Sequence, residues 1–242
     1  TTNRGCVRLP LTVTRRCSQA VVQEARKIVH SFEAHESNCE GLIRQAAYKA
    51  ADGQLGSSYF SIVQDGDMVL CRVNSPLVSQ CFKFLRAGRK ATIMGRDVGQ
   101  GLISTINKMK AESIVDLTSK LSDWFHNEVA KETAKRLPND SRIIALQDRY
   151  DCLKCFCEDQ STVQAVIDKI NAIFTDNRDN PGVKFASIHR SKGLEAKAVY
   201  LLEPKGSEVP HPMAKSSWQI AQEWHLRYVA ITRAIETLTF VS

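Results

Sequence analysis

The sequence has 242 residues but no uninterrupted apolar run near the ~18 residues that a membrane-spanning helix requires. The basic start, from Thr1 to Arg16, also lacks the apolar core and the small-residue cleavage site of a signal peptide. We therefore expect no membrane partner. The chain begins without a methionine and in the middle of a pattern, which we interpret as the start of an excised fragment.

A phosphate-binding loop is also missing. The pattern G-x-x-x-x-G-K-[ST] occurs nowhere, and the glycine-rich stretch 95–101 has no Lys-Ser/Thr pair after it. No apolar strand ends in the paired acids that would hold Mg²⁺. We therefore expect that this chain alone does not hydrolyse a nucleoside triphosphate.

Disulfides are not needed, although the sequence has eight cysteines. The chain is long and apolar enough to fold around its own core, so a reducing cytoplasm fits best. The one dense cluster, Cys152-x2-Cys155-x-Cys157, has no fourth cysteine or histidine nearby. Its apolar neighbours suit a buried helix as well as a metal site, so we assign no metal and leave that alternative open.

Positive charge, in contrast, is plentiful. The net charge is +7, and the excess is concentrated in the first thirty residues and again over residues 83–96. A basic surface attracts polyphosphates, nucleic acid first. A solvated basic face is the alternative on charge alone.

The apolar pattern predicts an α/β fold with a helical insertion. Helical spacing over 18–32, with Ser18 as cap, precedes a strand over 68–71, a helix from Ser75-Pro76 to Gly88 with Leu85 on its buried face, and a strand over 91–94. This order is typical of a parallel sheet. Purely helical spacing follows until about 174, and then strands over 183–188, 198–202 and 237–241 and a helix over 218–234 restore the sheet.

The most informative loop is 187–195, which reads S-I-H-R-S-K-G-L-E after a predicted strand. Gly193 would let a backbone approach a ligand, and Glu195 can accept hydrogen bonds from sugar hydroxyls. His189 and Lys192 can meet phosphates. An ordinary polar loop is the alternative.

A second informative stretch is 223–234, which reads E-W-H-L-R-Y-V-A-I-T-R-A. Its apolar stripe fits a core helix with a solvated arginine at the end. The functional interpretation is that Arg233 points at a phosphate, because a guanidinium suits the charge on a transferred phosphoryl group.

Together these stretches closely resemble motifs V and VI of the UvrD-like superfamily 1 DNA helicases, T-x-H-x-x-K-G-L-E and E-x-x-L-x-Y-V-A-x-T-R-A. The stretches 11–17, 70–75 and 209–211 resemble further family patterns. The resemblance implies a RecA-like parallel sheet flanked by helices. It also implies a discontinuous second motor domain over 1–105 and 181–242, with a reduced accessory subdomain, the helical insertion, over 106–180.

The resemblance implies a role for each matching residue. Arg16 and Arg233 would reach the γ-phosphate of ATP as catalytic groups, and Glu195 would bind the ribose beside Gly193. Arg15 stands where the family has an adenine-stacking Tyr; a guanidinium can also stack, or Arg15 can be solvated. The residues expected to contact single-stranded DNA are Asn74, Ser187 (in place of the family's Thr), His189, Lys192 and His211.

The implied function is the C-terminal motor domain of an ATP-dependent 3′–5′ DNA helicase. An N-terminal motor domain of the same protein would bind most of the ATP phosphates and hold the Mg²⁺. Two alternatives remain at this point: a non-enzymatic single-stranded nucleic-acid-binding module, and part of a helicase–nuclease.

Overall fold

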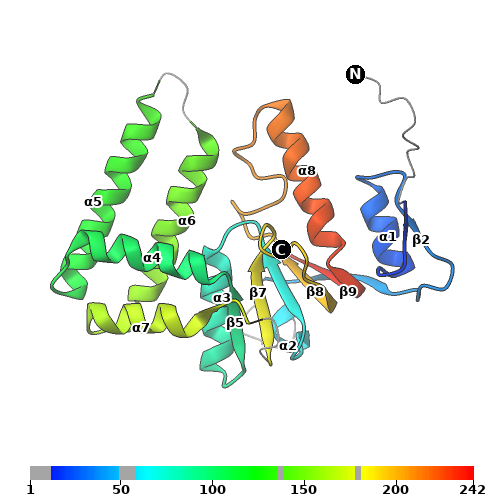
Figure 1. The fold of residues 1–242 in the computed structure, drawn as a ribbon, viewed down its shortest axis with the longest axis horizontal. Coiled ribbons are helices and arrows are strands. Elements are labelled where there is room, and N and C mark those ends of the chain that lie inside the picture. Colours follow the sequence, from blue (N-terminus) through cyan, green and yellow to red (C-terminus); the bar gives the residue numbers. More distant parts are fainter. Residues whose placement is uncertain (1–11, 49–57, 136–138, 178–180) are drawn as a thin grey trace, which may run out of the picture.

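The computed structural model describes residues 12–48, 58–135, 139–177 and 181–242. Its centre is a seven-stranded parallel sheet with the order β3-β9-β8-β4-β7-β5-β6 (Figure 1). The strands are β3 (Leu42–Ala46), β4 (Met68–Cys71), β5 (Ala91–Met94), β6 (Phe174–Thr175), β7 (Val183–Ser187), β8 (Ala196–Leu202) and β9 (Ala234–Val241). A separate parallel pair joins β1 (Val13–Thr14) to β2 (Glu33–Ala34). The expected α/β class with a parallel sheet is therefore confirmed.

Helices cover both faces of the sheet. The elements are α1 (Gln19–Arg26), α2 (Tyr59–Ile62), α3 (Ser75–Arg86), α4 (Arg96–Met109), α5 (Ile114–Thr133), α6 (Asp140–Cys157), α7 (Val163–Ile173) and α8 (Ser217–Ile231). Strand β4 shows why both faces must be covered, since all four of its residues are buried. Val69 and Cys71 join the core beneath α3 and the insertion helices, whereas Met68 and Leu70 join the core beneath α1 and α8. Side chains alternate between the faces of a strand, so one short apolar run serves two cores.

Several element ends differ from the sequence prediction. Ser18 caps α1 as expected, but the helix ends at Arg26, and Phe32 instead packs edge-on against Tyr228 of α8. Asn74, rather than Ser75, is the cap residue of α3, and Leu85 is exposed while Phe84 takes the buried position. Helix α8 ends at Ile231, and β9 begins already at Ala234. Strand β3 was not predicted at all.

The insertion is not purely helical. Helices α5, α6 and α7 occupy most of residues 106–180, but Phe174–Thr175 forms the short strand β6, which pairs with β5 at the edge of the main sheet. The expectation of no strand in this range is therefore wrong at these two residues. Helix α4, Arg96–Met109, also runs across the predicted boundary at 105/106. The insertion helices share one apolar core with α3 and the sheet, so they are anchored on the sheet.

The glycine-rich stretch 95–101 has a structural explanation. Gly95 has a φ of 121° and precedes α4. A Cβ on Gly99 would lie 2.8 Å from the Cβ of Phe174, so glycine allows α4 to approach β6 closely. The stretch serves packing, consistent with the prediction that it is not a phosphate loop.

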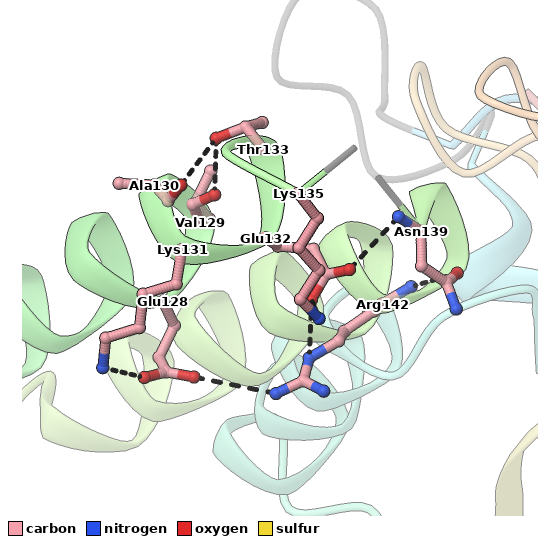
Figure 2. A network of polar contacts seen from close by, with 9 residues as sticks. All are labelled: Glu128, Val129, Ala130, Lys131, Glu132, Thr133, Lys135, Asn139 and Arg142. Atoms are coloured by element: carbon pink, nitrogen blue, oxygen red, sulfur yellow. Dashed lines mark hydrogen bonds and ion pairs between the residues drawn. The ribbon is translucent and has the colours of Figure 1, made fainter. Parts of the chain in front are cut away.

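An ion-pair network ties α5 to α6 near their connected ends (Figure 2). The carboxylate of Glu132, whose side chain is 2% exposed, receives the Lys135 ammonium at 2.6 Å and the Arg142 Nε at 3.1 Å. The backbone N–H of Asn139 donates to the same carboxylate at 3.2 Å. The hydrogen bond from Lys135 holds the pKa of Glu132 below its usual range. The network joins the end of α5 to the start of α6.

The cysteine cluster lies on α6 and behaves as part of the core. Cys152 and Cys157 are buried there, and burial raises the pKa values of all three thiols. Across the described ranges, no three His, Cys, Asp or Glu side chains gather as a metal site would require. In the same ranges, no helix has the length and apolar character to cross a membrane.

Candidate functional site

The predicted site residues fall into two groups at the two ends of segment 188–195. This segment leaves the carboxyl end of β7 and reaches the amino end of β8. It therefore runs from the side of the sheet where the strands end to the side where they begin. His189 lies near its start and Glu195 at its end. One continuous piece of backbone thus joins two chemically different places.

The first place, which we call the arginine group, consists of Arg16, Glu195 and Arg233. Arg16 precedes α1, and its Nε lies 2.5 Å from Oε2 of Glu195; both side chains are about half exposed. Arg233 follows α8, where its backbone carbonyl accepts a hydrogen bond from the N–H of Ala196 at 3.1 Å. Three residues from distant parts of the sequence thus lie close together.

Arg233 is held by neutral partners. Its guanidinium donates to the carbonyl oxygens of Val229 at 3.0 Å and Leu194 at 3.2 Å, and to the hydroxyl of Thr232 at 3.3 Å. Burial lowers the pKa of Arg233, and the nearby charge of Arg16 lowers it further. Two guanidinium groups that repel each other form a place where an anion is stabilised. The donor set therefore fits a phosphate.

The surroundings of the arginine group are open. Gly193 has a φ of +84°, and a Cβ there would meet nothing within 4 Å. Left-handed backbone therefore favours glycine at this position, with room for a ligand beside it. Arg15 and Lys192 are exposed. The buried Cys17, whose thiol lies 3.7 Å from the Thr232 carbonyl oxygen, packs beneath the group.

The second place, which we call the histidine cleft, is a cavity of about 300 Å³ at the carboxyl ends of β4 and β7. Its polar lining includes Arg72, His189, His211 and Glu223. His211 is 7% exposed, and its Nδ1 accepts a hydrogen bond from the N–H of Met213 at 3.2 Å. Burial and the neighbouring Arg72 lower the pKa of His211, and a hydrogen bond with the backbone of Gly206 partly offsets this shift. His189 keeps an exposed edge, but loss of water around the ring lowers its pKa too.

A buried ion pair builds the wall of this cleft. Glu223 accepts two hydrogen bonds from Nε of Arg72, each 3.0 Å, and one from Nη2 at 2.8 Å. The two side chains are 15% and 8% exposed. Oε2 of Glu223 also accepts from the N–H of His211 at 3.2 Å. Sequence reasoning missed Arg72, although it lies within the matching stretch 70–75 and Glu223 opens the second motif.

Asn74 and Ser187 also lie at the carboxyl ends of the strands, but their hydrogen-bond partners lie outside the histidine cleft. The side chain of Asn74 donates to Oδ2 of Asp148 at 2.9 Å, while the N–H groups of Asn74 and Ser75 donate to Oδ1 at 2.8 and 2.6 Å. Asp148 belongs to α6, so the insertion caps α3 and holds the Asn74 amide. Ser187 is buried at the end of β7, where its carbonyl accepts from the N–H groups of Arg190 and Ser191. Neither residue lines the histidine cleft.

Comparisons with known proteins are consistent with this arrangement. Residues 104–242 match the family model of the UvrD-like helicase C-terminal domain. PcrA of Staphylococcus epidermidis, named an ATP-dependent DNA helicase, is 30% identical over 146 residues, which are 57% of this chain and 20% of that protein. YjcD of Bacillus subtilis, whose name assigns it provisionally to the same class, is 36% identical over 80 residues, 31% of this chain and 10% of that protein. These alignments span a fifth or less of either relative.

A solved structure also resembles the chain, but weakly. It is the C-terminal domain of a possible DNA helicase from Lactobacillus plantarum, with 16% identity and a TM-score of 0.29 over 95% of this chain and 87% of that one. So low a score carries no argument about the site.

Proposed function

This chain belongs to the family of UvrD-like helicase C-terminal domains, and from that premise we propose that it is the second motor domain of an ATP-dependent helicase that moves 3′ to 5′ along single-stranded DNA. The observation that best supports the proposal is that one segment connects the arginine group with the histidine cleft. The arginine group lies at one end of 188–195 and the histidine cleft at the other. A motor must connect phosphate chemistry to its grip on the strand, and this segment provides a physical connection.

The arginine group would act on ATP that is bound mainly by an N-terminal motor domain. ATP, when bound together with Mg²⁺, supplies the phosphoryl group that is transferred to water. Arg16 and Arg233 would stabilise charge on the γ-phosphate, and Glu195 would accept hydrogen bonds from the ribose beside Gly193. Arg15 would stack on the adenine. Because the described part of this chain gathers no metal ligands, Mg²⁺ would be held by the N-terminal domain.

The histidine cleft would hold the strand. His211 would contact the strand from the wall of the cleft, and His189 and Lys192 would contact the phosphate backbone. Ser187 and Asn74 would act differently from the sequence expectation. Their contacts support a role in shaping the end of β7 and the start of α3, rather than direct contact with the strand.

The purified 242-residue chain is expected to bind a fluorescently labelled oligo-dT strand without hydrolysing ATP. Binding of about three phosphates should make affinity fall roughly twentyfold between about 50 and 200 mM salt, because released counterions drive association. Fluorescence anisotropy and a phosphate-release assay measure the two properties. His211→Ala should weaken binding, whereas His126→Ala, on α5 and outside the cleft, should not. Binding that ignores salt, or hydrolysis by this chain, would contradict the proposal.

A further inference from the structure

A second cavity, which we call the side cavity, lies next to the histidine cleft. It has a volume of about 560 Å³ and lies between α6, the start of α3 and the loop 204–213. Ile144, His211 and Met213 line both spaces, so the two share a wall. Figure 1 shows why the insertion matters here: α6 stands above the sheet beside α8. The Asp148 contacts hold α6 against the start of α3, and both helices contribute to the cavity wall.

The lining of the side cavity is mainly apolar with a few hydrogen-bonding groups. Tyr48, Val73, Pro76, Ile144 and Met213 supply apolar surface, which suits a flat, uncharged group. The volume is in the range of small-ligand sites. The site thus has the size and surface to take one planar ring system.

The polar lining contains the carboxylates of Asp148 and Asp151 and the ammonium group of Lys205, besides neutral hydrogen-bonding groups. Oδ2 of Asp151 accepts from the side-chain amide of Gln147 at 3.0 Å, which leaves Oδ1 to accept from another donor. Asp148 is a second carboxylate in the wall, but both of its oxygens already accept hydrogen bonds from Asn74 or Ser75. Two carboxylates repel a phosphate, but a carboxylate accepts readily from ring N–H and exocyclic amino groups. His211 adds a buried ring to the wall, and this ring also makes a hydrogen bond with the backbone of Gly206.

We propose that the side cavity binds one nucleobase turned out of a single strand that lies in the histidine cleft. The inference rests on the proposed function, because it takes the strand in that cleft as given. Phosphates would stay in the basic cleft, while the base would enter across the shared wall of Ile144, His211 and Met213. Stacking on apolar and aromatic side chains would supply affinity, as it does in other single-strand sites. Asp151 would favour adenine, cytosine and guanine over thymine, since these three bases carry an exocyclic amino group.

The chain offers a matched pair of variants to test this. Gln147 on α6 and Gln164 on α7 are both exposed, and each donates to an aspartate four residues later, at 3.0 and 2.8 Å. Gln147→Trp should fill the side cavity, whereas Gln164→Trp adds the same ring where there is no cavity wall. Each protein is titrated with an oligo-dC strand and with a strand of equal length that carries abasic positions, at one salt concentration.

The unaltered chain and Gln164→Trp should bind oligo-dC roughly tenfold more tightly than the abasic strand, the order expected for one stacked base. Gln147→Trp should bind both strands equally, at the weaker level. If Gln147→Trp keeps the full preference for oligo-dC, or if the unaltered chain binds both strands alike, this proposal is overturned while the proposed function stands. If the unaltered chain binds neither strand, the proposed function fails and this proposal with it.

Base preference gives a second test that does not depend on filling the cavity. Asp151→Asn should reduce the preference for oligo-dC over oligo-dT, because an amide can also donate to the thymine carbonyl. Asp168→Asn is the control, since Asp168 has the same helical partner geometry on α7. An unchanged preference in Asp151→Asn would count against recognition by Asp151 and overturn the assigned base contact.

Discussion

Replacing Arg233 by alanine in the complete protein is expected to lower the kcat of DNA-stimulated ATP hydrolysis by roughly 10³- to 10⁵-fold, the range for an arginine finger. Affinity for single-stranded DNA should stay close to normal. Arg233 is bound only by neutral partners and lies beside Arg16, so its charge is available to an anion. Such a group contributes most where charge develops in the transition state. Steady-state kinetics at saturating DNA, with a separate binding titration, measure both quantities.

Arg233→Lys is the informative companion variant. A lysine keeps the charge but cannot reproduce the planar fork that now reaches Leu194 and Val229, so turnover should remain low. The competing interpretation makes Arg233 a solvated residue at the end of α8 that complements the helix dipole. It predicts normal turnover and a stability change of about 0.3–1 kcal/mol. Normal turnover in Arg233→Ala would therefore end the assignment.

Glu223→Ala is expected to destabilise the isolated chain by about 3–5 kcal/mol, because it leaves the Arg72 guanidinium buried without its partner. The loss should be large since Glu223 accepts three hydrogen bonds from Arg72 and one from the backbone of His211. Urea denaturation followed by circular dichroism measures the free energy of unfolding.

Two controls separate this effect from a general response to losing a carboxylate. Glu128→Ala removes a partly exposed carboxylate that pairs with two exposed cations, Lys131 and Arg142, and it should cost no more than about 1 kcal/mol (Figure 2). Replacing Arg72 and Glu223 together by apolar residues of similar volume should cost much less than Glu223→Ala alone. An equal, small effect for Glu223→Ala and Glu128→Ala would show that the buried pair is not what holds the cleft wall.

The fold was predictable where local pattern and packing agree. Strand β4 was predicted from four consecutive apolar residues, and each of them is buried. The end of α1 was not predictable, because Ile28, Val29 and Phe32 continue the helical spacing while their contacts are made from a turn. Strand β3 was not predicted, for a related reason. It is a half-exposed edge strand paired only with β9, so its sequence lacks a strong alternation.

The functional site was likewise only partly predictable from the sequence. The resemblance to the helicase motifs assigned Arg16, Glu195 and Arg233 to one nucleotide site, and in the structure these residues are neighbours. The contact between Asp148 and Asn74 gave no sequence signal, because it joins an insertion helix outside any motif to a residue 74 positions away. The sequence predicted that Asn74 contacts single-stranded DNA. It could not predict the contact with Asp148, which forms only when the insertion is folded.

The most direct test of the account is a double-variant cycle on the complete protein with Arg16→Ala and Arg233→Ala. The measured quantity is the kcat of DNA-stimulated ATP hydrolysis for the unaltered protein, each single variant and the double variant. If both guanidinium groups stabilise the same transferred phosphoryl group, each single change should be severe, and the double variant should be little worse than the more severe single one. Near-normal turnover in both single variants, or a double variant whose loss is only the product of two small losses, would contradict the account.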